Sequence, residues 1–295
     1  MQIGIDVGAT KIESVVLDEN GNESNRERTD CPKDYFQIIK TIKEIDKKLE
    51  KEFNKELPIG VCHPGVHSPQ TGLVKNAPNC YWLEKKPFQN DLRKELGKEV
   101  FCENDANCFA LSEAFDGSAK NFKTVFGIIL GSGCGGGLVI DKKIIIGPNS
   151  FTGEWGHIPI GKPDSETNIE EYISGKGLER KFTARFNKNL SAHEIFKNAK
   201  DNSQDEIEII DEFKKKLARS LSLIINVIDP DAIVFGGGVS NEIESLDEIK
   251  KTTEKYLSNF NNIKNVNLKT IFLKPKFGDA SGVRGAAILS KQNTI

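Results

Sequence analysis

Residues 125–141 read Val-Phe-Gly-Ile-Ile-Leu-Gly-Ser-Gly-Cys-Gly-Gly-Gly-Leu-Val-Ile-Asp, and the rest of the chain is best understood from this stretch. The apolar run at 125–130 is typical of a buried strand, and a second apolar run follows at 138–140. Between them, 131–137 contains five glycines, so we expect a hairpin whose tip is bare main chain. Main-chain N–H groups without neighbouring Cβ atoms can converge on an anion, although glycine alone is equally consistent with a flexible turn.

The start of the chain repeats this arrangement of strand, polar turn and strand. Residues 3–11 read Ile-Gly-Ile-Asp-Val-Gly-Ala-Thr-Lys, and a second apolar run begins at Ile12. Asp6 is a carboxylate that can hold a hydrated Mg²⁺ ion, and Thr10 and Lys11 offer a hydroxyl and an ammonium group to phosphate oxygens. The first turn therefore predicts a second contact with phosphate.

A third glycine turn comes late in the chain, where residues 232–240 read Ala-Ile-Val-Phe-Gly-Gly-Gly-Val-Ser. Two hairpins that grip phosphates, with a later glycine turn under a nucleotide base, resemble the sugar kinase, actin and heat-shock ATPase superfamily. Within it the chain is most similar to the ROK family of sugar kinases, over essentially its whole length. The resemblance implies an α/β fold of two actin-like (ribonuclease H-like) domains with a cleft between them. We expect the N-terminal domain at 1–117, with 276–295 returning to it, and the C-terminal domain at 118–275.

The resemblance also implies ATP as the phosphoryl donor, with Mg²⁺ organised by Asp6. The three turns would then hold the nucleotide, the first two through its phosphates and the third beneath its adenine and ribose. The expected ATP and phosphate contacts are Asp6, Gly8, Thr10, Lys11, Gly131, Ser132, Gly133, Gly135, Gly136, Gly236, Gly237 and Gly238.

The segment 103–113 carries the expected catalytic group. It reads Glu-Asn-Asp-Ala-Asn-Cys-Phe-Ala-Leu-Ser-Glu, follows a predicted strand at 98–102, and has apolar residues at helical spacing. Asn104 and Asp105 therefore lie at a strand-to-helix junction, where a carboxylate is commonly just an N-cap. The Asn-Asp-Ala-Asn block closely resembles the ROK catalytic motif, which implies instead that Asp105 accepts the proton of the attacking sugar hydroxyl.

Further motifs resemble the sugar-binding segments of the family. They are a Pro-Gly turn at 64–65, the run 74–79, the segment Thr-Gly-Glu-Trp-Gly-His at 152–157 and the segment 168–175. Carboxylates suit this role because each oxygen accepts from a hydroxyl, although any one of them alone is more commonly a surface residue. The implied sugar contacts are Gly65, Asn79, Asn104, Asp105, Glu154, His157 and Glu170.

Three segments, 74–77, 153–157 and 278–287, most resemble the fructokinase and mannokinase branch. We therefore expect an ATP-dependent hexose kinase that phosphorylates the 6-hydroxyl of fructose, with mannose or glucose as further substrates. The block 104–114 looks equally like N-acetylglucosamine kinases, so an N-acetylglucosamine or N-acetylmannosamine kinase is the alternative. A sugar-responsive ROK repressor is disfavoured, because such proteins carry a helix-turn-helix domain ahead of the first hairpin, which here begins at residue 2.

Zinc is the point at which this sequence departs from the family. Typical ROK proteins bind zinc through the histidine that corresponds to His157 and three cysteines that follow it. Residues 158–169 contain no cysteine, and Asn168 stands where the last one would be, so we expect no zinc. Another group must then orient the imidazole of His157.

Composition sets the remaining expectations. The 295 residues carry a net charge of −2, which gives no reason to expect nucleic acid or an anionic membrane as partner. No apolar run is long enough to span a membrane, and the six cysteines are scattered without a CxxC pair, as in a reduced, cytoplasmic protein. The resemblance implies a sugar and ATP as the ligands, and a homodimer would be common for the family.

Two amphipathic helices are predicted between the motifs. Residues 34–53 and 205–229 carry apolar residues at helical spacing with charged residues between them, and Pro230 ends the second helix. Residues 116–122 are polar and predict a hinge between the domains.

Overall fold

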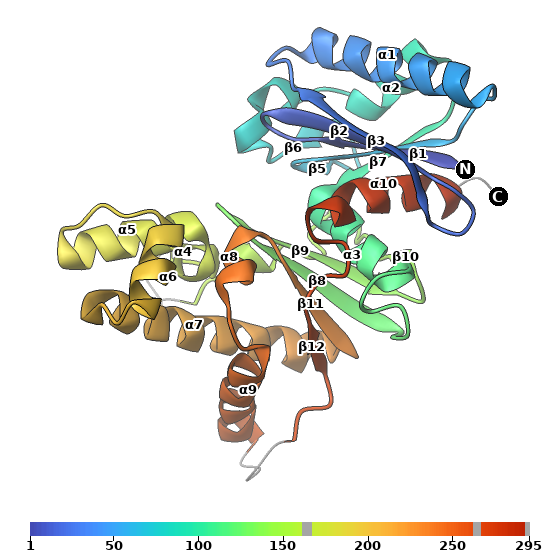
Figure 1. Cartoon of the computed structure of the whole chain (residues 1–295). Helices are drawn as coiled ribbons and strands as arrows, with labels where there is room; N and C mark the ends of the chain where they lie inside the picture. The colour runs from blue at the N-terminus through green and yellow to red at the C-terminus, as the bar shows by residue number, and fades with distance from the viewer. Residues whose placement is uncertain (161–166, 262–266, 293–295) are drawn as a thin grey trace.

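The computed structural model describes residues 1–160, 167–261 and 267–292, and Figure 1 shows them arranged in two lobes. Each lobe is built on a five-stranded sheet, and a small two-stranded sheet of β5 and β6 belongs to the first lobe. The two large sheets share one plan, in which a central strand pairs antiparallel with the next strand and parallel with a later one. The repeated hairpins of the sequence therefore correspond to a repeated sheet.

The first sheet has the strand order β3-β2-β1-β4-β7. Along its central strand, Ile3, Ile5 and Val7 lie in the hydrophobic core under the outer helices, so Gly4 and Asp6 alternate onto the other face. The strands of this lobe are β1 (Gln2–Val7), β2 (Lys11–Leu17), β3 (Glu23–Asp30), β4 (Ile59–His63), β5 (Val66–His67), β6 (Val74–Lys75) and β7 (Val100–Asn104).

The second sheet has the order β10-β9-β8-β11-β12, which is the same plan as the first. β8 and β9 form the glycine-rich hairpin, and β8 pairs parallel with β11. Its strands are β8 (Thr124–Leu130), β9 (Cys134–Ile140), β10 (Lys143–Ile144), β11 (Ala232–Gly236) and β12 (Ile271–Leu273).

The outer face of the first sheet is covered by α1 and α2 (Figure 1). Asp34 begins α1 as its N-cap by accepting the N–H of Gln37, and Ile38 and Ile42 on its inner face are fully buried. The helical segments of this layer are α1 (Tyr35–Phe53), the 3-10 helix η1 (Pro78–Leu83) and α2 (Phe88–Leu96).

The outer face of the second sheet is covered by α7, which ends just before Pro230 as predicted. Phe213, Leu217 and Leu221 of α7 share one core cluster with Phe126 and Ile128 of β8. The helices of this lobe are η2 (Trp155–His157), α4 (Glu170–Ile173), α5 (Gly175–Phe186), α6 (Ala192–Lys200), α7 (Gln204–Ile228), α8 (Gly238–Glu242) and α9 (Leu246–Asn261).

Two helices, α3 (Asp105–Phe115) and α10 (Ser281–Gln292), fill the space between the sheets, and η3 (Gly278–Ala280) leads into α10. Glycines allow each close approach. A Cβ at Gly60 would collide with the carbonyl of Ala286 in α10, and one at Gly285 would collide with Cys108 in α3. On the other side, a Cβ at Gly137 would lie 2.7 Å from the carbonyl oxygen of Ala106. The centre is therefore layered as sheet, α10, α3 and sheet.

The glycine hairpin differs in one respect from the prediction. Its tip spans only 131–133, because β9 already begins at Cys134, so the expected tip over 131–137 was too long. Gly136 and Gly137 are buried strand residues that let neighbouring segments approach β9, and a Cβ at Gly136 would lie 2.8 Å from the ring of Trp155. Part of the glycine run therefore serves packing.

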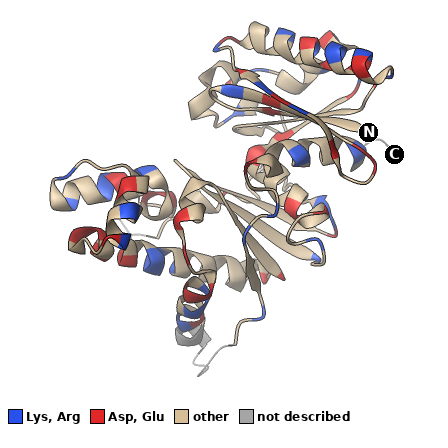
Figure 2. Cartoon of the chain, in the orientation of Figure 1, with Lys and Arg blue, Asp and Glu red and all other residues tan. Residues whose placement is uncertain are grey.

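Basic and acidic residues are mixed along the outer helices of both lobes, as Figure 2 shows. Among the described residues, no helix combines the length and the apolar character that a membrane crossing requires.

Candidate active site

Asn104 and Asp105 stand where β7 passes into α3, as predicted. Asn104 is the N-cap, because its Oδ1 accepts the N–H groups of Ala106 at 2.9 Å and Asn107 at 3.3 Å. Its Nδ2 donates to the carbonyl of Gly65 at 3.1 Å, which fixes the amide against the Pro-Gly turn. Since Asn104 caps the helix, Asp105 is its first residue and is free for another role, although it also accepts the N–H of Ala106.

Three carboxylates of the predicted site influence one another. Burial, together with the negative charge of Glu154, raises the pKa of Asp105 to about 6. Burial, and then the charge of Asp105, raises the pKa of Asp6 to about 7, while a hydrogen bond from Cys62 opposes this shift. Asp6 on β1, Asp105 on α3 and Glu154 ahead of η2 therefore form one electrostatic cluster that favours a bound cation or a shared proton.

The first turn is tight and open to solvent. The N–H of Gly8 donates to the carbonyl of Lys11 at 2.9 Å, and the side chains of Thr10 and Lys11 are exposed. Asp6, just before the turn, faces the start of α10, where a Cβ at Gly282 would lie 3.4 Å from its Oδ2. An anionic ligand could therefore reach Thr10 and Lys11 from solvent, beside the carboxylate of Asp6.

The tip of the second hairpin opens onto a cavity of about 620 Å³. Gly131 and Ser132 line it together with Gly238, the first residue of α8, so the second and third glycine turns meet at one cavity. Sequence reasoning missed other lining residues, because they come from α5, α6 and α8 and share no motif. Those with polar side chains are Lys176, Glu179, His193, Asn241 and Glu242.

The other predicted glycines have structural surroundings of their own. Gly133 lies at the hairpin tip beside Glu170, and Gly135 pairs with Ile129 in the β8–β9 ladder. Gly236 ends β11, and a Cβ there would lie 2.5 Å from the ring of Phe109. Gly237 has a φ of +88°, which favours glycine as the residue that turns the chain into α8.

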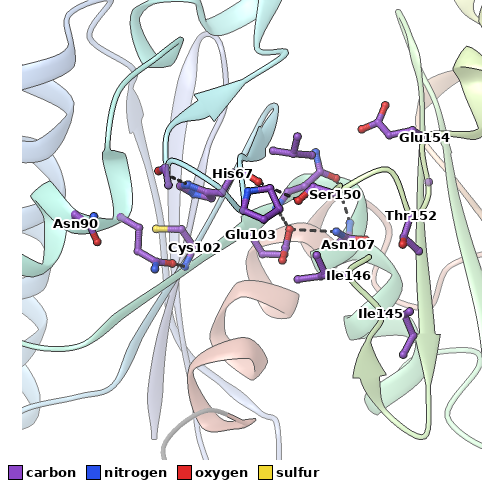
Figure 3. A pocket seen from close by; sticks show the side chains of 16 residues that line it. His67, Asn90, Cys102, Glu103, Asn107, Ile145, Ile146, Ser150, Thr152 and Glu154 are labelled. Carbon is purple, nitrogen blue, oxygen red and sulfur yellow. Dashed lines mark hydrogen bonds between the residues drawn. The ribbon is translucent and has the colours of Figure 1, made fainter. Parts of the chain in front are cut away.

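A second cavity, of about 260 Å³, lies between the lobes and is shown in Figure 3. Asn104 and Glu154 line it, as does Gly136, so it brings together parts of the predicted sugar site from both lobes. His67 also lines it and contacts the buried His63, with 2.9 Å between their Nε2 atoms. Asn79 is exposed on η1 and lines neither cavity.

Glu170 and His157 stand somewhat apart from that cavity. Glu170 accepts the N–H of Cys134 at 2.7 Å and so is held at the tip of the glycine hairpin. The side chain of His157 is 55% exposed, and its Nδ1 lies 3.0 Å from Glu154 Oε2. Trp155 anchors this segment by donating from Nε1 to the carbonyl of Gly135 at 2.9 Å. The carboxylate of Glu154 therefore orients the imidazole of His157.

Curated proteins similar to this chain are sugar kinases. An N-acetyl-D-glucosamine kinase of Photobacterium profundum is 36% identical over 307 aligned residues, covering 98% of this chain and 99% of its own length. Further relatives at 32–34% identity carry the same name. This finding overturns the expectation of fructose as the substrate. The segment 278–287 had suggested fructose. Its Gly282 lies against Asp6 and its Gly285 against α3, so these glycines serve helix packing rather than the choice of sugar.

Solved structures agree in fold over the whole chain. A ROK hexokinase from Thermus thermophilus superposes with a TM-score of 0.85 at 23% identity, covering 99% of this chain and 98% of that one. A ROK family glucokinase from Streptomyces griseus, in complex with glucose and AMPPNP, gives 0.79 at 26% identity, with 99% of both chains covered. The actin-like two-lobed ATPase fold is therefore confirmed. Since the model of the ROK family matches residues 2–293 and the relatives cover the full length, the chain belongs to the ROK family, among its sugar kinases.

Proposed function

We propose that this protein transfers the terminal phosphoryl group of ATP to the primary hydroxyl of N-acetylglucosamine. The observation that carries the proposal is the agreement among full-length relatives at 32–36% identity, all named as N-acetyl-D-glucosamine kinases. The cavity between the lobes supports it, because a sugar bound against Asn104 and Glu154 would lie next to Asp105.

Asp105 is the proposed general base. Phosphoryl transfer has a loose transition state, so the protein contributes mainly by positioning groups and neutralising charge. With a pKa of about 6, Asp105 is ionised at neutral pH and still basic enough to accept the proton of the attacking hydroxyl. Asn104 positions Asp105, because its capping hydrogen bonds hold the start of α3 in place.

The phosphate groups are proposed to lie between the two hairpins. Thr10 and Lys11 of the first turn and the main chain of 131–133 in the second are exposed or half-exposed donors at the two tips. The donor set fits Mg²⁺, which proteins commonly hold through one or two carboxylates together with substrate phosphates. Asp6 would hold it, because a cation would stabilise the ionised form of this buried carboxylate. When bound, the ion would neutralise charge on the transferred phosphoryl group.

The adenosine part of ATP is proposed to occupy the cavity of about 620 Å³ beside Gly131, Ser132 and Gly238. Domains at 1–117 with 276–295, and at 118–275, would close on each other around the substrates and exclude water. Residues 293–295 of that first domain lie outside the described residues. The six cysteines are all free thiols, which favours a reducing, cytoplasmic location.

An ADP-release assay with N-acetylglucosamine, N-acetylmannosamine, glucose and fructose tests the substrate. We expect the highest kcat/KM for N-acetylglucosamine and a product phosphorylated at the primary hydroxyl, identified by NMR. Enzyme carrying Asp105→Asn, prepared in parallel, measures any contaminating kinase. A higher kcat/KM for glucose, fructose or N-acetylmannosamine than for N-acetylglucosamine would show that the proposed substrate is wrong.

A further inference from the structure

The cavity between the lobes is lined by further residues besides the predicted sugar contacts. From Asn104 and Glu154 it continues to a second wall formed by Ile145 and Ile146 (Figure 3). The two lobes are in contact at this cavity. The hydroxyl of Ser150 in the second lobe donates to the carbonyl of His67 in the first at 3.0 Å. A partly apolar recess is therefore already formed next to the proposed sugar site.

Glu103 supplies the polar side of this recess. Its Oε1 accepts two hydrogen bonds, from the N–H of Asn104 at 2.8 Å and from Nδ2 of Asn107 at 3.1 Å. Its Oε2 accepts none from any residue in the described part of the chain. The side chain is half-buried, and burial raises the pKa of Glu103 even though these hydrogen bonds lower it. This carboxylate oxygen can therefore accept a hydrogen bond from a ligand in the cavity that Glu103 lines.

The ligand group that fits must carry an N–H or O–H next to a small apolar part. A 2-acetamido group has both, since its amide N–H can donate to a carboxylate and its methyl can lie against isoleucine side chains. A 2-hydroxyl group has only the polar part and would leave Ile145 and Ile146 without contact.

We infer that this recess is the subsite for the 2-acetamido group, in which Glu103 Oε2 accepts the amide N–H and Ile145 and Ile146 contact the methyl group. The inference rests on the proposed function and adds to it the residues that distinguish an acetamido sugar from a plain hexose. Glu103 then acts as a specificity-determining residue, and Asp105, two positions later, acts in the reaction itself.

The substitution Glu103→Gln separates the two roles of this side chain. The glutamine Oε1 can still accept from Asn104 and Asn107, so the start of α3 is preserved. Its Nε2 then takes the place of Oε2 and presents a donor to the recess. An amide N–H cannot pair with a donor, whereas a hydroxyl can turn and accept, because it both donates and accepts. The change should therefore penalise N-acetylglucosamine much more than glucose.

The measurement is the ratio of kcat/KM for N-acetylglucosamine to kcat/KM for glucose. We expect Glu103→Gln to lower this ratio by roughly tenfold or more, the effect of leaving a buried polar group without its partner. Glu99→Gln is the matched control, because Glu99 is exposed, directly precedes β7, the strand that contains Glu103, and should leave the ratio unchanged. Ile145→Ala should also lower the ratio, by about threefold to tenfold, through the lost methyl contact.

The outcomes separate this inference from the proposed function. If the wild-type enzyme prefers N-acetylglucosamine but Glu103→Gln lowers kcat/KM equally for both sugars, Glu103 is a structural residue and the inference is wrong. If the wild type prefers glucose, the proposed function is wrong. Preference for glucosamine that is lost in Glu103→Gln would show that the carboxylate binds an ammonium group, which would also overturn the inference.

Discussion

The carboxylate of Glu113 accepts a hydrogen bond from the hydroxyl of Ser281 at 2.7 Å, which joins the end of α3 to the start of α10. The same side chain is completely buried and accepts the N–H groups of Ser118 at 2.8 Å and Lys276 at 3.0 Å. Ser118 and Lys276 lie in the two segments through which the chain passes between the lobes. Glu113 therefore fastens both crossings at one point.

Replacing this carboxylate should destabilise the protein. Glu113→Ala leaves several buried donors unpaired, so we expect the free energy of unfolding to fall by about 3–5 kcal/mol. Urea denaturation, followed by tryptophan fluorescence, measures the change. Glu56→Ala is the control, because Glu56 is exposed and should change stability by less than about 0.5 kcal/mol. Equal stability of the two variants would contradict the role given to Glu113.

Asp105→Asn should remove the proposed base while keeping the fold. Asparagine is nearly isosteric and still accepts the N–H of Ala106, so the start of α3 is retained. We expect kcat to fall by roughly 10²–10⁴, the usual contribution of a positioned general base, with sugar binding by calorimetry largely preserved. The exposed Asp211→Asn serves as the control. Near-normal turnover would show that Asp105 serves only the helix terminus.

The raised pKa of Asp105 predicts an acid limb in the pH profile. The base must be ionised, so kcat/KM should rise with pH and reach half its plateau near the pKa of about 6. Burial is the main cause of the raised pKa, and the charge of Glu154 adds to it. Glu154→Gln removes that charge and should move the limb to lower pH, whatever it does to affinity. An unmoved limb would assign the titration to another group.

The sequence predicted the elements that have a strong local pattern. Both hairpins and α7 follow apolar runs or helical periodicity, and the structure places them where these patterns indicated. Strand β3 was not predicted, because its residues 23–30 read Glu-Ser-Asn-Arg-Glu-Arg-Thr-Asp and most of them are exposed. β3 is an edge strand that pairs with β2 alone in its sheet, so it carries no hydrophobic signal.

The site was only partly predictable for a different reason. Asn104 and Asp105 are adjacent in the chain, so one motif identifies both. Lys176, His193 and Asn241 meet at one cavity, but they come from three helices that only the tertiary fold brings together. The sugar was predicted wrongly because the segment 278–287, which suggested fructose, contains glycines that serve helix packing.

The two ends of the loop that follows His157 are joined by main-chain hydrogen bonds, from Ile160 to Thr167 at 3.1 Å and from Ile169 to Ile158 at 3.0 Å. Asn168, at the position of a missing cysteine, instead accepts the N–H of Glu171 at 3.1 Å. Residues 161–166 lie outside the described residues, and their sequence contains neither cysteine nor histidine.

We therefore expect purified protein to contain no stoichiometric zinc and to keep full activity after chelation once Mg²⁺ and ATP are restored. A structural zinc site needs four nitrogen or thiolate ligands, and His157 supplies one at most. The described residues contain no group of three side chains suited to a metal ion. Elemental analysis by mass spectrometry measures the zinc content. Glu154→Ala removes the carboxylate beside His157. This variant should also bind no zinc, because the missing ligands are cysteines. About one zinc per chain, lost together with sugar affinity on chelation, would contradict the prediction.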